Sequence, residues 1–362
     1  MPAADSASWL LAGSGDAAWL LALAIALTAL ASWLACGAVL RLLVAWRVYD
    51  EPNRRSSHAV AKPRGAGLAI VPVVLFAWIA AALAAGRADA GFWAIVAGAA
   101  MLGAISWADD LRSRPASLRF GVQVAAVSLG LWALDPADLV FQGLLPPAAD
   151  RLAAALAWLW FINLFNFMDG IDGIAAVETI AVGGGLALVA ALQGEAPATI
   201  LPGAVLAAAA LGFLYWNWAP SRLFLGDVGS VPLGYLLGWL LLAAAAGGEW
   251  AAAVILPLYY LADASLTLVR RAWRREKLWR AHREHFYQRA VQRGFGHAAV
   301  ALRVLACNVV LVGLALTAAA TESDVFHWLA LLFALLAVVI LLFMLARQAP
   351  PRTPGEPAPP AA

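Results

Sequence analysis

Amides and carboxylates recur at a regular spacing in the middle of the chain, directly after a strongly apolar stretch. Asn163, Asn166 and Asp169 occupy every third position, and Asp172 follows between two glycines. On a helix the first three side chains share one face. The glycines weaken the helix, so Asp172 can turn toward the same side. Polar side chains at membrane depth are costly and indicate a functional site; the alternative is a helix end that faces water.

Two further acidic groups have the composition of a metal or acid–base site. Asp109 and Asp110 are adjacent, and neighbouring carboxylates repel each other unless a cation shares them. Such a pair suits metal binding or general-base chemistry, or it is a helix end balanced by Arg112 and Arg114. Asp227 lies among glycines whose backbone can approach a phosphate. Because Asp227 is itself anionic, a phosphate there needs a divalent cation between the two.

Basic segments containing histidines complete the set of candidate residues. His58 and Arg64 lie in a loop with many cations, which serves either to set membrane topology or to contact substrate. Asp263 precedes a long run of arginines and aromatic residues that contains His282 and His285. Cations interleaved with aromatics can hold anionic lipid headgroups, and they can equally hold a diphosphate.

The composition predicts an all-α, polytopic integral membrane protein. Of the 362 residues, 64% are hydrophobic and 13% charged, whereas soluble domains are about half apolar and a quarter charged. The start of the chain has no basic segment typical of a cleavable signal peptide, so we expect the first apolar run to remain as an anchor. Cys36 and Cys307 lie far apart in apolar runs and predict neither a disulfide nor a metal pair. His297 and His327 are interpreted as structural.

Eleven apolar runs are long enough to cross a bilayer, which takes about 20 residues each. They predict a single transmembrane domain over residues 1–347, followed by a disordered, proline-rich tail at 348–362. The expected spans are 17–46, 66–86, 90–108, 118–135, 152–168, 172–193, 198–217, 229–247, 249–269, 299–320 and 325–346.

The distribution of cations predicts the orientation. With alternating crossings, all 24 lysines and arginines except Arg87 and Arg151 lie on, or at the membrane edge of, one side. The positive-inside rule makes that side cytoplasmic. The N-terminus is then periplasmic and the C-terminus cytoplasmic. Every candidate group described above falls on the predicted cytoplasmic face.

These groups occur in the order of the motifs of a known family. The motifs are Asp109-Asp110, Asn163-x-x-Asn166-x-x-Asp169-Gly-x-Asp172-Gly, Phe224-x-Gly-Asp227-x-Gly-Ser and the His282/His285 loop. Over roughly residues 40–295 the chain therefore resembles the polyprenyl-phosphate N-acetylhexosamine-1-phosphate transferases. It is most similar to the transferases that initiate O-antigen synthesis in Gram-negative bacteria. The peptidoglycan enzyme of the family has three consecutive histidines in the late loop. Here Arg283 and Glu284 separate two, which argues against a MurNAc-pentapeptide substrate.

The resemblance implies a UDP-N-acetylhexosamine donor, undecaprenyl phosphate as acceptor, UMP as product, and Mg²⁺ or Mn²⁺ as cofactor. It implies that Asp227 is the first metal ligand. Asp109 and Asp110 would deprotonate or orient the lipid phosphate and share in metal binding, and a two-step route through an acyl-phosphate stays open. The implied substrate-binding residues are His58, Arg64, Asn163, Asn166, Asp169, Asp172, Asn217, Phe224, Asp263, His282, Arg283 and His285.

The same resemblance predicts the surroundings of the enzyme. It implies a multi-pass protein of the bacterial inner membrane with its active site on the cytoplasmic face, a homodimer, and no nucleic-acid partner. The alternative from another class is a secondary transporter that uses intramembrane carboxylates. Transporter sites lie near the bilayer midplane between repeated halves, whereas here the acids gather at one face. A scaffold protein would leave the buried polar groups unexplained. The identity of the donor sugar stays open.

Overall fold

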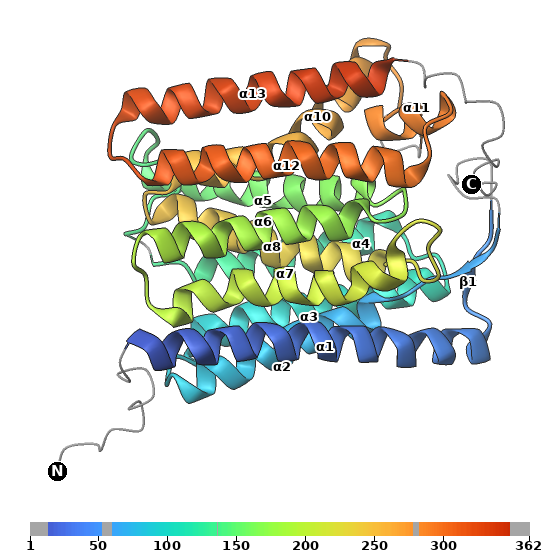
Figure 1. Cartoon of the computed structure of the whole chain (residues 1–362), viewed down its shortest axis with the longest axis horizontal. Helices are drawn as coiled ribbons and strands as arrows, with labels where there is room; N and C mark the ends of the chain where they lie inside the picture. The colour runs from blue at the N-terminus through green and yellow to red at the C-terminus, as the bar shows by residue number, and fades with distance from the viewer. Residues whose placement is uncertain (1–13, 53–59, 136, 278–281, 348–362) are drawn as a thin grey trace.

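The computed structural model describes residues 14–52, 60–135, 137–277 and 282–347. Its long helices run side by side in one bundle, with connecting loops at both ends (Figure 1). The helices are α1 (Ser14–Trp46), α2 (Gly67–Ala84), α3 (Ala90–Leu111), α4 (Ala116–Trp132), α5 (Pro147–Met168), α6 (Ile174–Leu192), α7 (Pro197–Asn217), α8 (Asp227–Ala246), α9 (Trp250–Ile255), α10 (Leu258–Trp273), α11 (Phe286–Gln292), α12 (His297–Ala319) and α13 (Asp324–Ala346).

The all-α membrane architecture is confirmed. Every expected span overlaps a helix or a pair of helices, and nine of the described helices are long and apolar enough to cross a membrane. Two spans differ from the expectation. Helix α4 has only 17 residues, and the span expected at 249–269 is divided into α9 and α10.

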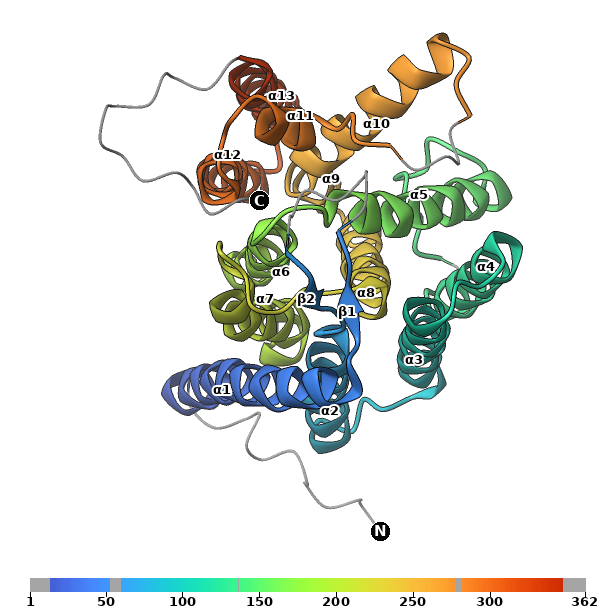
Figure 2. The ribbon, with the colours of Figure 1, turned by 90° about the vertical axis from the view of Figure 1, so that its right-hand side faces the viewer.

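The division of the ninth span has a local cause. Pro257 has no backbone N–H and occupies the N-cap of α10, so the hydrogen-bond ladder of α9 stops immediately before it. Helix α10 then leans away from its neighbours, as the end-on view shows (Figure 2). Arg270 and Arg271 lie in its last turn, where cations interact favourably with the negative end of the helix dipole.

A small sheet and a close backbone contact bring distant segments together at one end of the bundle (Figures 1 and 2). Strand β1 (Tyr49–Asp50) pairs antiparallel with β2 (Lys62–Pro63). The chain after β2 then runs beside Phe224, whose carbonyl accepts hydrogen bonds from two consecutive backbone amides. A Cβ on Gly67 would lie 2.2 Å from the backbone nitrogen of Gly229, so only glycine permits this approach of α2 to α8.

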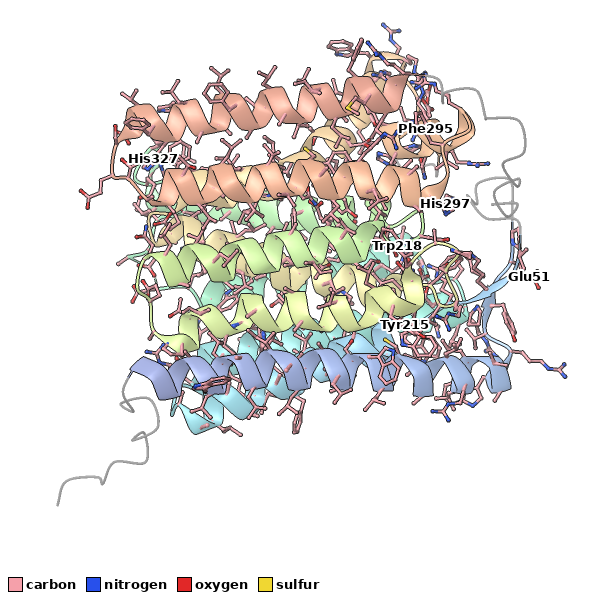
Figure 3. The ribbon with its side chains drawn as sticks, in the orientation of Figure 1. Glu51, Tyr215, Trp218, Phe295, His297 and His327 are labelled. Carbon is pink, nitrogen blue, oxygen red and sulfur yellow. The ribbon has the colours of Figure 1, made fainter. Side chains whose placement is uncertain are left out.

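Figure 3 places His327 at one end of the bundle and Glu51, Trp218 and His297 at the other. The connections that carry the candidate groups therefore share one end. The predicted tail at 348–362 lies outside the described residues, as do residues 53–59, which include His58.

One polar pair is buried between membrane-spanning helices, Glu178 of α6 and Asn308 of α12. Both side chains are buried, and the Asn308 amide donates to Glu178 Oε2 over 2.8 Å. Neither Glu178 Oε1 nor Asn308 Oδ1 has a hydrogen-bond partner within the described part of the chain. Unpaired polar atoms are costly in a membrane interior. If Glu178 carried a proton on Oε1, that hydroxyl could donate to Asn308 Oδ1. Both atoms would then have a hydrogen-bond partner.

We therefore expect Glu178→Gln to fold normally, because a neutral amide keeps a donor and an acceptor at this position. Glu178→Ala should lose about 1–3 kcal/mol of stability, since it leaves the Asn308 amide unpaired. The apparent melting temperature of the detergent-purified protein measures both effects. Equal destabilisation by the two substitutions would show that Glu178 is needed as a charged group.

Candidate functional site

Asp110 binds the beginning of α8. Its carboxylate accepts hydrogen bonds from the backbone amides of Asp227 at 3.4 Å and Val228 at 3.0 Å. The first amides of a helix have no partner within the helix, and a negative charge there also interacts favourably with the helix dipole. The Asp110 side chain is only 2% exposed. Asp110 therefore fixes the position and direction of Asp227.

Arg64 connects these two carboxylates. Its Nη2 atom lies 2.9 Å from Asp110 Oδ1 and 2.6 Å from Asp227 Oδ1. Burial alone would lower the pKa of Arg64, but the charges of Asp227 and Asp110 raise it above its ordinary value. The guanidinium therefore stays charged and offsets the repulsion between the two acids. Arg64 can do this because the backbone around it is hydrogen-bonded to the segment at Phe224.

Asn166 and Arg119 surround the rest of Asp227. The Asn166 amide donates to Asp227 Oδ1 at 3.1 Å and to the hydroxyl of Ser230 at 2.8 Å. Arg119 Nη1 lies 3.9 Å from Asp227 Oδ2 and 2.7 Å from Asp109 Oδ2. The adjacent acids of the sequence thus have different partners: Asp110 binds α8 and Arg64, whereas Asp109 binds Arg119.

Asp169 differs from these residues because its carboxylate has no hydrogen bond or ion pair among the described residues. It is the C-cap residue of α5 and is partly buried. Burial raises its pKa to about 7; Arg64 opposes the rise and Asp227 adds to it. A carboxyl group with a pKa near neutrality can accept or release a proton under physiological conditions.

Asp172 is fully engaged within the protein. Ser221 donates to it through its hydroxyl at 2.8 Å and its backbone amide at 3.0 Å. Lys62 Nζ and His297 Nδ1 lie 3.5 and 3.4 Å from the same carboxylate. Burial would raise the pKa of Asp172, but His297 and Ser221 together lower it to about 2. His297, interpreted from the sequence as structural, is therefore a neighbour of this candidate residue.

Two of the candidate asparagines, Asn217 and Asn163, form hydrogen bonds that connect different segments of the protein. Asn217 accepts from the backbone amide of Gly173 at 2.8 Å and donates to the carbonyl of Leu223 at 3.0 Å. Asn163 pairs with Gln123 of α4, at 2.9 Å from its Nδ2 atom. The spacing predicted that Asn163 and Asn166 would face one site. Only Asn166 reaches the cluster of Asp110, Arg64 and Asp227, called the Asp227 cluster below.

Phe224 and Lys62 form a cationic, aromatic wall beside Asp172. Lys62 Nζ lies 5.1 Å from the centre of the Phe224 ring and 3.0 Å from the Ser221 hydroxyl. Both side chains are partly buried. A cation beside an aromatic face can hold a phosphate and a stacked base at the same time.

The late histidine loop is anchored by Asp263. This carboxylate, fully buried on α10, accepts from the backbone amides of Phe286 at 2.9 Å and Tyr287 at 3.2 Å. The Tyr287 hydroxyl then donates to the carbonyl of Phe167 at 3.0 Å. A Cβ on Gly170 would lie 2.1 Å from that hydroxyl. Asp263 thus holds α11 against the segment between α5 and α6, which contains Asp169.

His282 and His285 lie together on this loop, with ring centroids 4.8 Å apart. Burial, followed by the neighbouring His285 and Arg271, lowers the pKa of His282 to about 4. His282 is therefore neutral at pH 7 and can act as a hydrogen-bond partner. The carbonyl of Arg283 accepts from the side chain of Gln292, which holds the loop against α11.

Sequence reasoning missed four residues of this end of the bundle. Lys62, Arg119, Ser221 and His297 contact candidate carboxylates but were not expected in the site. The sequence does point to Arg119, because a cation at the predicted cytoplasmic edge of a membrane span indicates a functional residue. Ser221 and His297 had none, because their contacts depend on how distant loops meet.

A metal would depend here on substrate as well as protein. Among the described residues, no group of three or more His, Cys, Asp or Glu side chains could hold a metal ion. Asp227 Oδ2, however, has only Arg119 nearby within the described part of the chain, at 3.9 Å. Mg²⁺ is commonly bound by one or two carboxylates together with substrate phosphates. The residues present fit a cation held by Asp227 and a phosphate.

The chain is similar to a known protein family and to a bacterial relative. A family model described as Glycosyl transferase family 4 matches residues 92–245, which include α3 to α8. The chain is also 28% identical over 273 residues to a probable undecaprenyl-phosphate N-acetylglucosaminyl 1-phosphate transferase of Bacillus subtilis (strain 168). That alignment covers 72% of this chain and 74% of the relative.

The Asp263 anchor is testable by hydrogen exchange. In Asp263→Asn, one carboxylate acceptor is replaced by an amide, so the amides of Phe286 and Tyr287 should exchange faster and stability should fall by about 1–3 kcal/mol. Thr267→Val is the matched control, because it removes only a 3.4 Å contact to Asp263. Unchanged protection in Asp263→Asn would contradict the anchoring role.

Proposed function

We propose that this chain, a member of glycosyl transferase family 4, transfers an N-acetylhexosamine-1-phosphate from a UDP-sugar to undecaprenyl phosphate. The family match and the Bacillus subtilis relative support a sugar-1-phosphate transferase acting on this lipid. The observation that carries the assignment of the site is the Asp110–Arg64–Asp227 cluster. It gathers two acids and a fixed cation at one end of a membrane bundle.

In the proposed reaction, an oxygen of the lipid phosphate attacks the β-phosphorus of the UDP-sugar. The bond from that phosphorus to the oxygen of UMP breaks, and UMP leaves. Donor and acceptor are both anionic, so the site must offset their repulsion and hold them in line. Arg64 and Arg119 supply positive charge beside Asp227. A bound divalent cation on Asp227 would neutralise further phosphate charge.

The contacts support a division of roles among the acids. Asp227 is proposed to hold the metal, and Asp110 to position Asp227 through the start of α8. Asp169, with its raised pKa and no described partner, is proposed to face the reacting phosphates. Asp109 is held by Arg119 and is proposed to orient that cation. These roles shift the direct chemistry from the Asp109–Asp110 pair toward Asp227 and Asp169.

The nucleotide is proposed to bind between the cationic, aromatic wall of Phe224 and Lys62 and the loop that carries His282 and His285. Phe224 can stack on uracil and Lys62 can contact the diphosphate. Asp172 and Asn217 then act as scaffolding, because their polar groups already have protein partners. The product is proposed to be the first lipid-linked sugar of a cell-envelope polysaccharide of the O-antigen type.

The main test of the assignment is UMP release from UDP-N-acetylhexosamines by purified protein with undecaprenyl phosphate and Mg²⁺. We expect Asp227→Asn to lower kcat by about 100-fold or more. The matched control is Asp324→Asn, an exposed acid at the opposite end of the bundle, which should retain wild-type turnover. Normal turnover of Asp227→Asn would refute the metal assignment, and absence of UMP release in wild type with every donor would refute the transferase.

The cytoplasmic location of the site is a separate prediction, which rests on the cation asymmetry and on the family resemblance. Green fluorescent protein fused after residue 362 should fluoresce, and alkaline phosphatase fused there should be inactive. Fusions after residue 322, between α12 and α13, should give the reverse pattern. Active phosphatase at the C-terminus would invert the proposed topology.

A further inference from the structure

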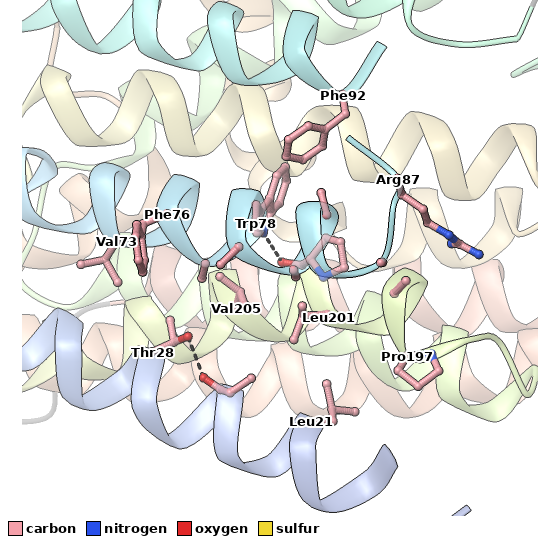
Figure 4. Close-up of a pocket in the computed structure, with 18 of the residues that line it drawn as sticks. Leu21, Thr28, Val73, Phe76, Trp78, Arg87, Phe92, Pro197, Leu201 and Val205 are labelled. Atoms are coloured by element: carbon pink, nitrogen blue, oxygen red, sulfur yellow. Dashed lines mark hydrogen bonds between the residues drawn. The ribbon is translucent and has the colours of Figure 1, made fainter. Parts of the chain in front are cut away.

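A large apolar groove lies away from the candidate site. Its volume is about 1120 Å³, and it is lined by α1, α2, α7 and the start of α3 (Figure 4). Such a volume slightly exceeds the roughly 300–1,000 Å³ typical of ligand pockets. Leu27 and Phe76, two of its lining residues, are 55% and 75% exposed. The groove is therefore open on the side of the bundle, where lipid would surround it.

The walls of the groove suit hydrocarbon. The hydroxyl of Thr28 donates to the carbonyl of Ala24 at 2.7 Å, and the Trp78 indole donates to the carbonyl of Pro202 at 3.3 Å (Figure 4). These polar side chains thus use their donors within the protein. The other lining residues along the three helices are mostly apolar.

The length of the groove corresponds to one leaflet. On α2 its lining extends over residues 72–82, or about 15 Å at 1.5 Å per residue. The hydrocarbon core of a bilayer is about 30 Å thick. On α2 the lining begins only at Pro72, so the start of the helix at Gly67, which lies near the Asp227 cluster, is outside the groove.

Two charged residues, Arg87 and Asp89, lie at the remote end of the groove. Both are exposed, and although only two positions apart they do not form an ion pair with each other. Arg87 has no ion pair among the described residues. One oxygen of Asp89 accepts from the Phe92 amide at 2.7 Å, which leaves the other oxygen available. By contrast, Arg151, at the same end, is held by backbone carbonyls.

We propose that this groove binds one phospholipid whose headgroup carries both a phosphate and a primary ammonium, of the phosphatidylethanolamine type. The phosphate binds Arg87, the ammonium binds Asp89, and the acyl chains lie along α2. A purely anionic headgroup would place uncompensated charge beside Asp89. A polyprenyl acceptor fits less well, because the groove has the depth of one leaflet and its charged end is remote from the candidate site. This inference is independent of the transferase activity.

Native mass spectrometry of the full-length, detergent-purified protein tests the proposal. The probes are phosphatidylethanolamine, phosphatidylcholine and phosphatidylglycerol with identical acyl chains. Wild type should retain one phosphatidylethanolamine in preference to the other two. Arg87→Gln and Asp89→Asn should each weaken its binding about tenfold, because each removes one charge-assisted contact. Arg87→Lys should keep most of the affinity.

Two pairs of variants separate the groove from the rest of the surface. Ala77→Phe fills the groove and should remove binding of all three lipids, whereas Leu83→Phe, on the same helix but outside the lining, should not. Asp138→Asn, an exposed acid in the loop after α4, is the control for Asp89→Asn. If Ala77→Phe does not fold, the two exposed charge variants still decide the question. Equal retention of the three lipids, or displacement by undecaprenyl phosphate, would overturn the proposal.

Discussion

The ion cluster of Asp110, Arg64 and Asp227 sets the geometry of this end of the molecule, because each of its members comes from a different part of the chain. Asp110 is at the end of α3, Arg64 lies just before α2, and Asp227 begins α8. Two carboxylates this close repel each other unless a cation lies between them. The guanidinium supplies that cation, and the α8 amides supply the remaining hydrogen bonds of Asp110. Removing Arg64 would leave the two carboxylates without the cation between them.

A second constraint holds the bend between α5 and α6. The Asp172 carboxylate binds Ser221 and lies near Lys62 and His297, while Asn217 binds the backbone at Gly173. On the other side, Tyr287 donates to the carbonyl of Phe167. Because these hydrogen bonds fix the bend on both sides, they also fix the position of Asp169. The raised pKa of Asp169 follows from that position, since the residue is partly buried near other acids.

The two ends of the bundle differ in chemistry. One end collects cations, acids and hydrogen-bonded loops that suit phosphate chemistry, whereas the other has a groove with apolar walls and a single pair of opposite charges. Helix α2 links them, because it begins at Gly67 against α8 and lines the groove from Pro72 onward. A lipid in the groove would thus contact the same helix that holds Arg64 in place.

The sequence by itself determined the membrane class, the approximate positions of the helices and the gathering of the candidate residues at one end of the bundle. Those features depend on apolar run length and on the distribution of cations along the chain. The sequence did not determine how the polar groups pair. Asn163 and Asn166 have identical side chains three residues apart, yet one binds Gln123 and the other reaches Asp227. The capping role of Asp263 and the contact of His297 with Asp172 likewise depend on helix packing. Only the tertiary structure decided them, because residues that lie 23 to 125 positions apart in the chain must meet before such contacts exist.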